Sequence, residues 1–204
     1  MGEVGTKRAT YADIEATPEG VIAEIIDGEL VTQPRPANRH NGAATNLIVT
    51  LGPPFQRGRD GPGGWLFLFE NEVKFGDDLL VPDVSGWRTE RLVNLPETNW
   101  ISVRPDFVCE VLSRSTEKRD RTAKRRIYAE HGVPYYWLID PRRQTLEAFE
   151  LQGDDWQPLG NWRAADEVRA RPFDSLAFSL AELWPFDAPL GFNEERQALF
   201  DGDR

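Results

Sequence analysis

Short hydrophobic runs, separated by glycine, proline and charged positions, set the pattern of this chain. Hydrophobic residues recur at helical spacing over 38–51, which predicts an amphipathic helix. Two apolar runs flank Asp27 and Gly28 within 21–31, a pattern that predicts a β-hairpin with a tight turn. Further strands are expected at 65–69, 72–75, 79–87, 107–112, 135–140, 144–151 and 156–159, and short helices at 11–16 and 179–184.

Two longer connections complete the pattern. A helix is expected to start at Ser115 or Thr116 and to stop at Gly132, because a hydroxyl residue favours a helix start and glycine a helix end. The segment 52–64 is rich in Gly and Pro and lacks the Gly-Lys-Ser/Thr ending of a phosphate-binding loop, so we expect a connecting loop. The alternation of strands and helices, with hairpins at both ends, predicts an α/β fold on a mixed sheet.

Length and composition indicate one soluble domain. We expect a single domain over 1–204, with its core at about 10–185 and a loosely held tail at 186–204. No apolar run approaches the roughly 18 residues that a membrane span needs. The polar start has no apolar stretch typical of a signal peptide, and a single cysteine, Cys109, fits a reducing compartment. These features predict a cytoplasmic protein without a membrane partner.

The net charge of −10 counts against a protein that coats DNA without sequence preference, because such binding depends on neutralising phosphates. The charge is uneven, however: 114–126 holds seven basic residues and two acidic ones. A basic face on an acidic protein can steer a polyanion to one place, although it can equally be a solvated helix face. The candidate nucleic-acid contacts are Arg114, Lys118, Arg121 and Arg125.

Three acidic residues stand where strands are expected to be buried. Glu24 lies in VIAEII, Asp83 follows LLVP, and Glu110 lies in FVCEVL. An unpaired buried carboxylate costs several kcal/mol, so each needs a cation, a hydrogen-bond network or a metal. One such residue usually forms a structural ion pair. Three in different strands are explained more simply if they cluster around one divalent ion.

The helix that follows Glu110 supplies a cation. Asp120, Lys124 and Tyr128 are spaced four residues apart and therefore line one stripe of that helix. Ile127 lies beside the stripe and indicates that it faces inward. Lys124 can then reach the site of Glu110. The alternative is an Asp120–Lys124 pair on the surface, worth about 0.3–0.5 kcal/mol.

The run PDFVCEVLSRSTEKRDRTAKRRIYAEHGVPYYWLIDP (105–141) resembles the signature of the Uma-two family of endonucleases, a branch of the PD-(D/E)-x-K superfamily. The resemblance extends over roughly residues 10–185, and the combination of its pieces is specific. The other matching pieces are EIIDGEL (24–30), His40 at a helix start, PDVS (82–85) and FDSLAFSLAELW (173–184).

The resemblance implies a restriction-endonuclease-like fold in which acidic residues hold Mg²⁺ (or Mn²⁺) near a scissile phosphate. It assigns catalytic roles to Asp83, Glu110 and Lys124, and metal binding to Asp83 and Glu110 with Glu24 as an extra carboxylate. The (D/E)-x-K part of the motif begins at Glu110, and its third position is Leu112 where a lysine is expected. The resemblance therefore implies that the lysine lies on the following helix, at Lys124. Arg114 and Ala23 also depart from the family pattern, but neither replaces a catalytic group.

Four further residues are candidates for a supporting role. Asp106 belongs to a second Pro-Asp pair and, by strand alternation, shares a face with Glu110, although the gap of four residues is short for the motif. His40 follows Pro36 at a helix start, where a structural role is the stronger interpretation. Asp120 and Tyr128 complete the set through their place on the stripe of Lys124.

The resemblance implies a nucleic acid as partner, with DNA the preferred candidate, and a homodimer. Two alternatives to a nuclease stay open: a non-catalytic protein that binds nucleic acid or a protein on the same fold, and an assembly module. Structural zinc is excluded by one Cys and two His, and the Gly-x-Ser-x-Gly motif of serine hydrolases is missing. The assembly module would dimerise through an aromatic surface at Trp156, Trp162 and Trp184.

Overall fold

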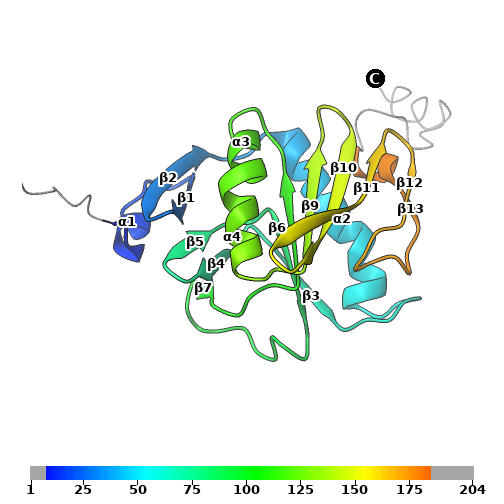
Figure 1. The fold of residues 1–204 in the computed structure, drawn as a ribbon, viewed down its shortest axis with the longest axis horizontal. Helices are drawn as coiled ribbons and strands as arrows, with labels where there is room; N and C mark the ends of the chain where they lie inside the picture. Colours follow the sequence, from blue (N-terminus) through cyan, green and yellow to red (C-terminus); the bar gives the residue numbers. More distant parts are fainter. Residues whose placement is uncertain (1–7, 185–204) are drawn as a thin grey trace, which may run out of the picture.

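The computed structural model describes residues 8–184, which form two main β-sheets with helices packed against them (Figure 1). The larger sheet has a parallel pair, β8 and β9, at its centre, and its other neighbours are antiparallel. This mixed sheet confirms the predicted fold class. Its strands run in the order β11 (Asp155–Arg163), β10 (Thr145–Gln152), β9 (Tyr135–Asp140), β8 (Phe107–Val111), β6 (Val84–Arg88) and β3 (Trp65–Phe69).

One helical segment connects the parallel strands, as parallel pairing requires a crossover. It consists of α3 (Glu117–Arg119), the π-helical turn η2 (Asp120–Lys124) and α4 (Arg125–Glu130). We call the whole of 117–130 the crossover helix. Thr116 precedes this helix, and Gly132, which adopts φ of 70°, follows its end. The predicted boundaries are therefore confirmed. The π turn was not predicted.

A second, five-stranded sheet lies beside the first. Its hairpin of β1 and β2 turns at Asp27 and Gly28, which adopt φ of 55° and 79°. These left-handed values are the reason that Asp-Gly is a strong hairpin signal. The short helix α1 (Tyr11–Glu15) precedes the hairpin. The strands of this sheet follow the order β2 (Glu29–Pro34), β1 (Val21–Ile26), β5 (Asp78–Leu80), β4 (Glu72–Phe75) and β7 (Trp100–Ile101).

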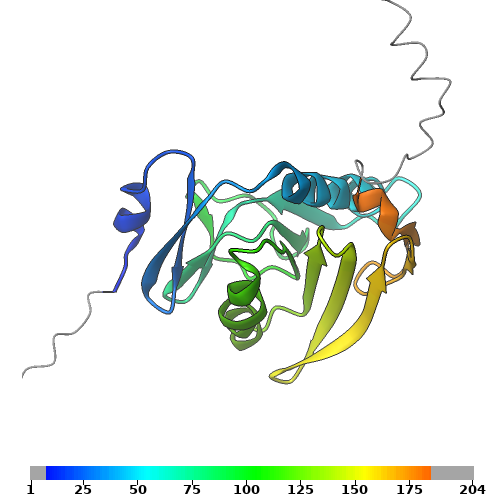
Figure 2. The ribbon, with the colours of Figure 1, turned by 90° about the horizontal axis from the view of Figure 1, so that it is seen from above.

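Two hydrophobic clusters cover the two faces of the six-stranded sheet, and Figure 2 shows the helices that pack on either side of it. On one face, α2 (Asn38–Leu51) and the 3₁₀ turn η3 (Leu180–Leu183) pack against alternate residues of β8 such as Cys109. On the other face, the crossover helix packs against Val108 and against residues of the five-stranded sheet. Both faces of β8 are therefore buried, which explains its continuous apolar sequence.

One predicted strand is wrong. The run 79–87 forms two strands, β5 and β6, which belong to different sheets. Pro82 lies between them and has no backbone N–H to give to a ladder. The break leaves Asp83 at the junction of the two sheets, directly before β6.

Other differences concern short elements. The first part of the predicted loop 52–64 is helical, because the π turn η1 (Gly52–Gln56) continues α2. The two-stranded pair β12 (Glu167–Val168) and β13 (Phe178–Ser179) was not predicted. Within 8–184 no helix is long and apolar enough to cross a membrane. The predicted tail at 186–204 lies outside the described residues.

Candidate active site

Three strands and the crossover helix bring the predicted acidic residues and the lysine together at the junction of the sheets. Lys124 Nζ lies 2.9 Å from Glu24 Oε1 and 2.7 Å from Glu110 Oε1. Glu24 comes from β1 of the smaller sheet, and Glu110 comes from β8 of the larger one. Lys124 also donates a hydrogen bond of 3.4 Å to the carbonyl of Val81, just before the break that positions Asp83. The lysine thus links both sheets.

These ionic side chains are shielded from water. The exposed fractions are 2% for the Lys124 side chain, 1% for Glu24 and 3% for Glu110. Such charges are tolerated only when each is paired and the remaining oxygens accept hydrogen bonds. Glu24 Oε1 accepts from the amide of Val81 at 2.9 Å, and its Oε2 lies 3.4 Å from Arg119 Nη1. The surface alternative for Lys124 is therefore wrong.

The same stripe of the crossover helix carries Asp120 and Tyr128, as predicted from their spacing. The hydroxyl of Tyr128, which is fully buried, donates to Glu110 Oε1. Asp120 is buried and interacts electrostatically with Lys124. The π turn η2 runs from Asp120 to Lys124. Single π turns are frequent at functional sites.

Asp83 is fixed by two contacts. Its Oδ2 accepts a hydrogen bond of 2.6 Å from the amide of Val111, and its Oδ1 lies 2.7 Å from His40 Nε2. The antiparallel register pairs Val84 with Cys109, so Asp83 stands at the level of Glu110 on the neighbouring strand. His40 reaches Asp83 from the first turn of α2 and is buried. The structure therefore brings His40 to the site.

The site holds more negative than positive groups. Burial raises the pKa of Glu110 well above its usual value; the charge of Lys124 opposes this shift, whereas Asp120, Asp83 and Glu24 reinforce it. Burial acts to lower the pKa of Lys124, but the attraction of Glu110, Glu24 and Asp120 outweighs it and raises that pKa. Lys124 therefore stays protonated and offsets only part of the carboxylate charge.

The donor set fits a hard divalent cation. Mg²⁺ and Mn²⁺ prefer oxygen ligands, and the site offers carboxylate oxygens in excess of its resident cations. Among residues 8–184, no group of three or more His, Cys, Asp or Glu side chains already stands in position to hold a metal. The ammonium of Lys124 lies between the carboxylates of Glu24 and Glu110.

Asp106 lies outside this cluster. It precedes β8, four residues from Glu110, which corresponds to roughly 13 Å along a strand. Its Oδ1 pairs with Arg91 Nη1, and its Oδ2 accepts a hydrogen bond of 2.9 Å from the amide of Arg88. These contacts hold the loop after β6 and give Asp106 a structural role.

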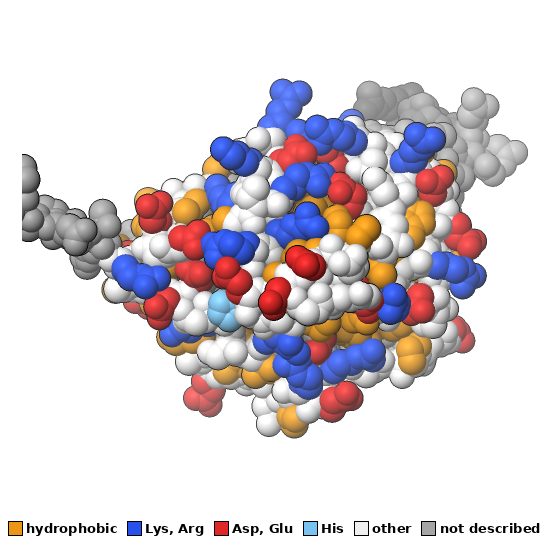
Figure 3. All heavy atoms as spheres, viewed as in Figure 1, with side chains coloured by type: hydrophobic (Ala, Val, Ile, Leu, Met, Phe, Trp, Pro, Cys, Tyr) orange, Lys and Arg blue, Asp and Glu red, His pale blue; other side chains and the backbone are white. Residues whose placement is uncertain are grey.

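The predicted basic contacts divide into two kinds. Arg114 and Lys118 are exposed at the start of the crossover helix, where Lys and Arg side chains gather among acidic ones (Figure 3). Arg121 is instead held by Glu147 at 2.5 Å. Arg125 lies over the ring of Phe149, 4.4 Å from its centroid. Only the first pair is free to meet phosphate groups without breaking these contacts.

Arg119 was not predicted as a site residue. It contacts Glu24 and donates a hydrogen bond of 3.0 Å to Gln33 Oε1 at the end of β2. Arg119 lies in a run of basic residues, and nothing in the sequence distinguishes it from its neighbours Lys118 and Arg121.

The tryptophans argue against the predicted aromatic surface. Trp184 is 5% exposed and belongs to the core around α2. Trp156 and Trp162 are half-buried and pack against the two hydrophobic clusters. Trp156 Nε1 also donates to the carbonyl of Arg125 at 2.9 Å. The prediction that Trp184 contributes to an aromatic assembly surface is therefore wrong. Trp156 and Trp162 expose only part of their side chains.

Comparisons with known proteins identify the family and the fold of this chain. The family described as "Uma2: Putative restriction endonuclease" matches residues 8–181. A crystal structure of "a putative nuclease belonging to DUF820" from Anabaena variabilis is similar at a TM-score of 0.68 and 23% identity, covering 86% of this chain and 97% of that chain. At this identity the likeness shows the fold alone. No curated protein matches the chain.

Replacing Lys124 tests whether its ion pairs hold the junction together. In Lys124→Met, Glu24 and Glu110 would lose their shared cation in a buried site, and we expect a loss of about 3–5 kcal/mol in the free energy of unfolding. Urea unfolding in the presence of a chelator measures this loss. Lys118→Met, an exposed change on the same helix, should alter stability by less than about 0.5 kcal/mol. Equal stability of the two variants would contradict the buried pairing.

The buried carboxyl of Asp120 predicts a pH dependence. Burial raises the pKa of Asp120 to about 6, with Lys124 opposing the shift. Because the folded pKa lies above the unfolded one, this group stabilises the protein fully below about pH 4 and ceases to do so as the pH rises through 6. Relative to Asp120→Asn, the metal-free protein should lose about 2–2.5 kcal/mol between pH 4 and 7. Parallel stability curves for the two proteins would show that Asp120 titrates normally.

Proposed function

Because the chain belongs to the Uma2 family, we propose that it is a metal-dependent endonuclease that hydrolyses phosphodiester bonds with Asp83, Glu110 and Lys124. The supporting observation is the buried contact of Lys124 with Glu24 and Glu110, next to an anchored Asp83. A structural protein gains little from such a group, since apolar residues of similar volume are often at least as stabilising. A nuclease needs both acidic ligands and a cation at the scissile phosphate.

In this proposal Asp83 and Glu110, with Glu24 beside them, hold Mg²⁺ or Mn²⁺. The ion, when bound, supplies a Lewis acid that polarises the phosphate and activates water. His40 and the Val111 amide keep the Asp83 carboxylate in place, and Tyr128 does the same for Glu110. Ligands that are already held in position lower the free energy needed to reorganise the site during the reaction.

Lys124 has a second role in the reaction. With the carboxylate charge neutralised by a bound divalent ion, the ammonium of Lys124 would be available to interact with the phosphate. There it stabilises the negative charge that develops on the phosphate oxygens, or it orients the attacking water. Its raised pKa keeps it protonated for the first of these tasks.

The proposed substrate is DNA, which the family's description as a restriction endonuclease supports. Arg114 and Lys118, exposed at the start of the crossover helix, would contact backbone phosphates outside the site. The net charge of −10 disfavours binding of DNA over the surface as a whole, so the proposed contacts depend on a local group of basic side chains. A homodimer and a cytoplasmic location stay predictions.

Nicking of supercoiled plasmid with Mg²⁺ or Mn²⁺ tests the proposal. The parent protein should cleave, a chelator should stop it, and Glu110→Gln and Lys124→Met should each lower the rate at least about 100-fold. Glu90→Gln, which changes an exposed carboxylate outside the site, should cleave like the parent.

Two results would contradict the proposal. Full metal-dependent cleavage by Glu110→Gln would remove Glu110 from the mechanism. No cleavage of plasmid, single-stranded DNA or RNA by the folded parent would favour a binding protein on a nuclease fold.

A further inference from the structure

Arg119 lies at the edge of the buried carboxylate cluster. Its side chain is 22% exposed, whereas that of Glu24, which it contacts, is 1% exposed. Arg119 Nη1 lies 3.4 Å from Glu24 Oε2 and donates a hydrogen bond of 3.0 Å to Gln33 Oε1. Both partners belong to the hairpin of β1 and β2, which lies beside the start of the crossover helix (Figure 1). Arg119 therefore stands between the buried cluster and the solvent.

The π turn η2 accounts for this position. In a regular α-helix, residues five apart point about 140° away from each other. A π turn bonds residues that are five apart, as an α-helix bonds residues that are four apart, so it places them one turn above each other. Arg119 and Lys124, which are five apart across η2, reach the two oxygen atoms of one carboxylate, that of Glu24. The π turn thus brings a second cation next to the lysine.

Two other arginines of the crossover helix have more of their guanidinium occupied. Arg121 uses all three nitrogen atoms, and Arg126 uses two, to hold carboxylates of neighbouring residues. Arg119 uses only Nη1, and among residues 8–184 no hydrogen bond or ion pair engages its Nε or Nη2. A guanidinium presents its N–H donors in a fixed fork that matches two oxygen atoms of a phosphate or carboxylate. The edge of Arg119 formed by Nε and Nη2 is therefore available to a ligand.

The positive charge of Arg119 is only partly neutralised. Gln33 Oε1 is an uncharged acceptor, and Glu24 is shared with Lys124, which lies closer to it, at 2.9 Å against 3.4 Å. A contact of 3.4 Å is longer than an ordinary hydrogen bond from nitrogen to oxygen. An anion at this edge would therefore meet a cation that no carboxylate holds for itself. Because the other carboxylates of the cluster repel an anion, we expect the contact to form when a divalent ion offsets their charge.

We propose that Arg119 binds a backbone phosphate of the nucleic-acid substrate through Nε and Nη2, as a substrate-binding residue of the active site. The identity of this anion rests on the proposed function. A planar guanidinium holds two oxygen atoms of one phosphate and fixes its orientation, whereas an ammonium acts as a point charge. Lys124 is 2% exposed, so Arg119 is the cation of this site that an approaching strand meets first.

The salt dependence of DNA binding tests the inference without any cleavage. Fluorescence anisotropy of a labelled DNA duplex is measured at several KCl concentrations, with fixed Ca²⁺ in place of Mg²⁺ because both ions bind carboxylate oxygens. Arg119→Met should bind at least about tenfold more weakly and lower the slope of log K against log salt by about one, since one phosphate contact is lost. Arg119→Lys should restore the slope, because the charge is kept, but only part of the affinity, because the fork is lost.

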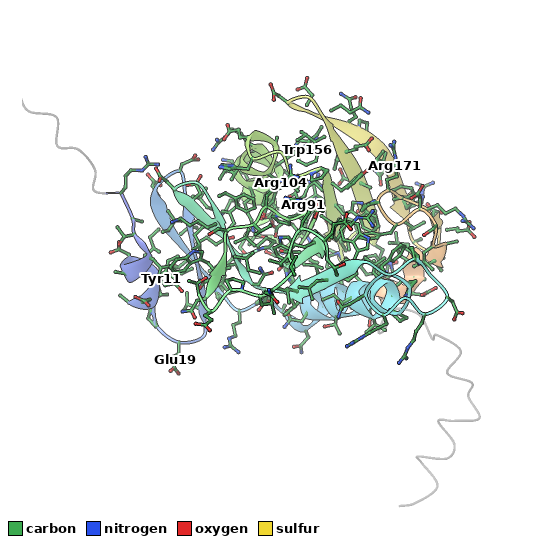
Figure 4. The ribbon with its side chains drawn as sticks, turned by 90° about the horizontal axis from the view of Figure 1, so that it is seen from below. Tyr11, Glu19, Arg91, Arg104, Trp156 and Arg171 are labelled. Carbon is green, nitrogen blue, oxygen red and sulfur yellow. The ribbon has the colours of Figure 1, made fainter. Side chains whose placement is uncertain are left out.

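Two further variants control for the loss of one positive charge. Arg126→Met changes the same residue type on the same helix, where Asp27 and Glu130 hold the guanidinium. Arg171→Met removes a distant cation: Figure 4 shows Arg171 at the opposite end of the molecule from Tyr11. Both variants should bind the duplex with the affinity and the salt slope of the parent protein.

The outcomes separate this inference from a structural role and from the proposed function. If Arg119 only supports Glu24, Arg119→Met would unfold at lower urea but keep the salt slope of the parent, and this result would overturn the inference. A parent protein that cleaves DNA, with Arg119→Met equal to it in slope and cleavage rate, would overturn the inference alone. Binding that depends on Arg119 in a protein that cleaves nothing would support the inference and contradict the proposed function. Absence of binding to duplex DNA, single-stranded DNA and RNA would overturn both.

Discussion

The contact of Lys124 with Glu24 and Glu110 is the interaction on which the arrangement of this protein depends. It joins β1 of one sheet, β8 of the other and the crossover helix in a single buried group. None of the three charges is stable there alone, since burial penalises each ionised form. The two sheets are therefore held in one relative position by an electrostatic requirement as well as by the hydrophobic cluster that surrounds the crossover helix.

The same buried group carries an excess of acidic side chains over basic ones. Four buried carboxylates, Glu24, Asp83, Glu110 and Asp120, share one fully buried lysine and the half-buried Arg119. Asp83 belongs to this group because the chain breaks at Pro82, between β5 and β6, where the two sheets meet. His40 of α2 holds the Asp83 side chain there. A chain that needed only stability could fill this junction with apolar residues. Its acidic excess is understandable in a member of a nuclease family.

Much of the fold could be predicted because its elements are local. α2, β3 and β9 coincide with uninterrupted apolar patterns bounded by Gly, Pro or charged residues. Glu24, Glu110 and Lys124 could be found because charges in apolar runs need partners. The break at Pro82 was missed because hydrophobicity continues across it, and the π turn because π and α turns use the same residues. Arg119 gave no signal, since its neighbours in sequence include several other cations and its contact with Glu24 is visible only in three dimensions.

The most direct test of the central claim is anomalous diffraction from crystals soaked in Mn²⁺. The acidic excess predicts an anomalous peak at coordination distance from the carboxylates of Asp83 and Glu110, with Lys124 no longer bridging Glu24 and Glu110. A peak there would show that the buried carboxylates form a metal site that the lysine occupies in the metal-free protein. Density without such a peak at saturating Mn²⁺, with Lys124 still between the two glutamates, would show that the cluster is a structural ion network and would contradict the account.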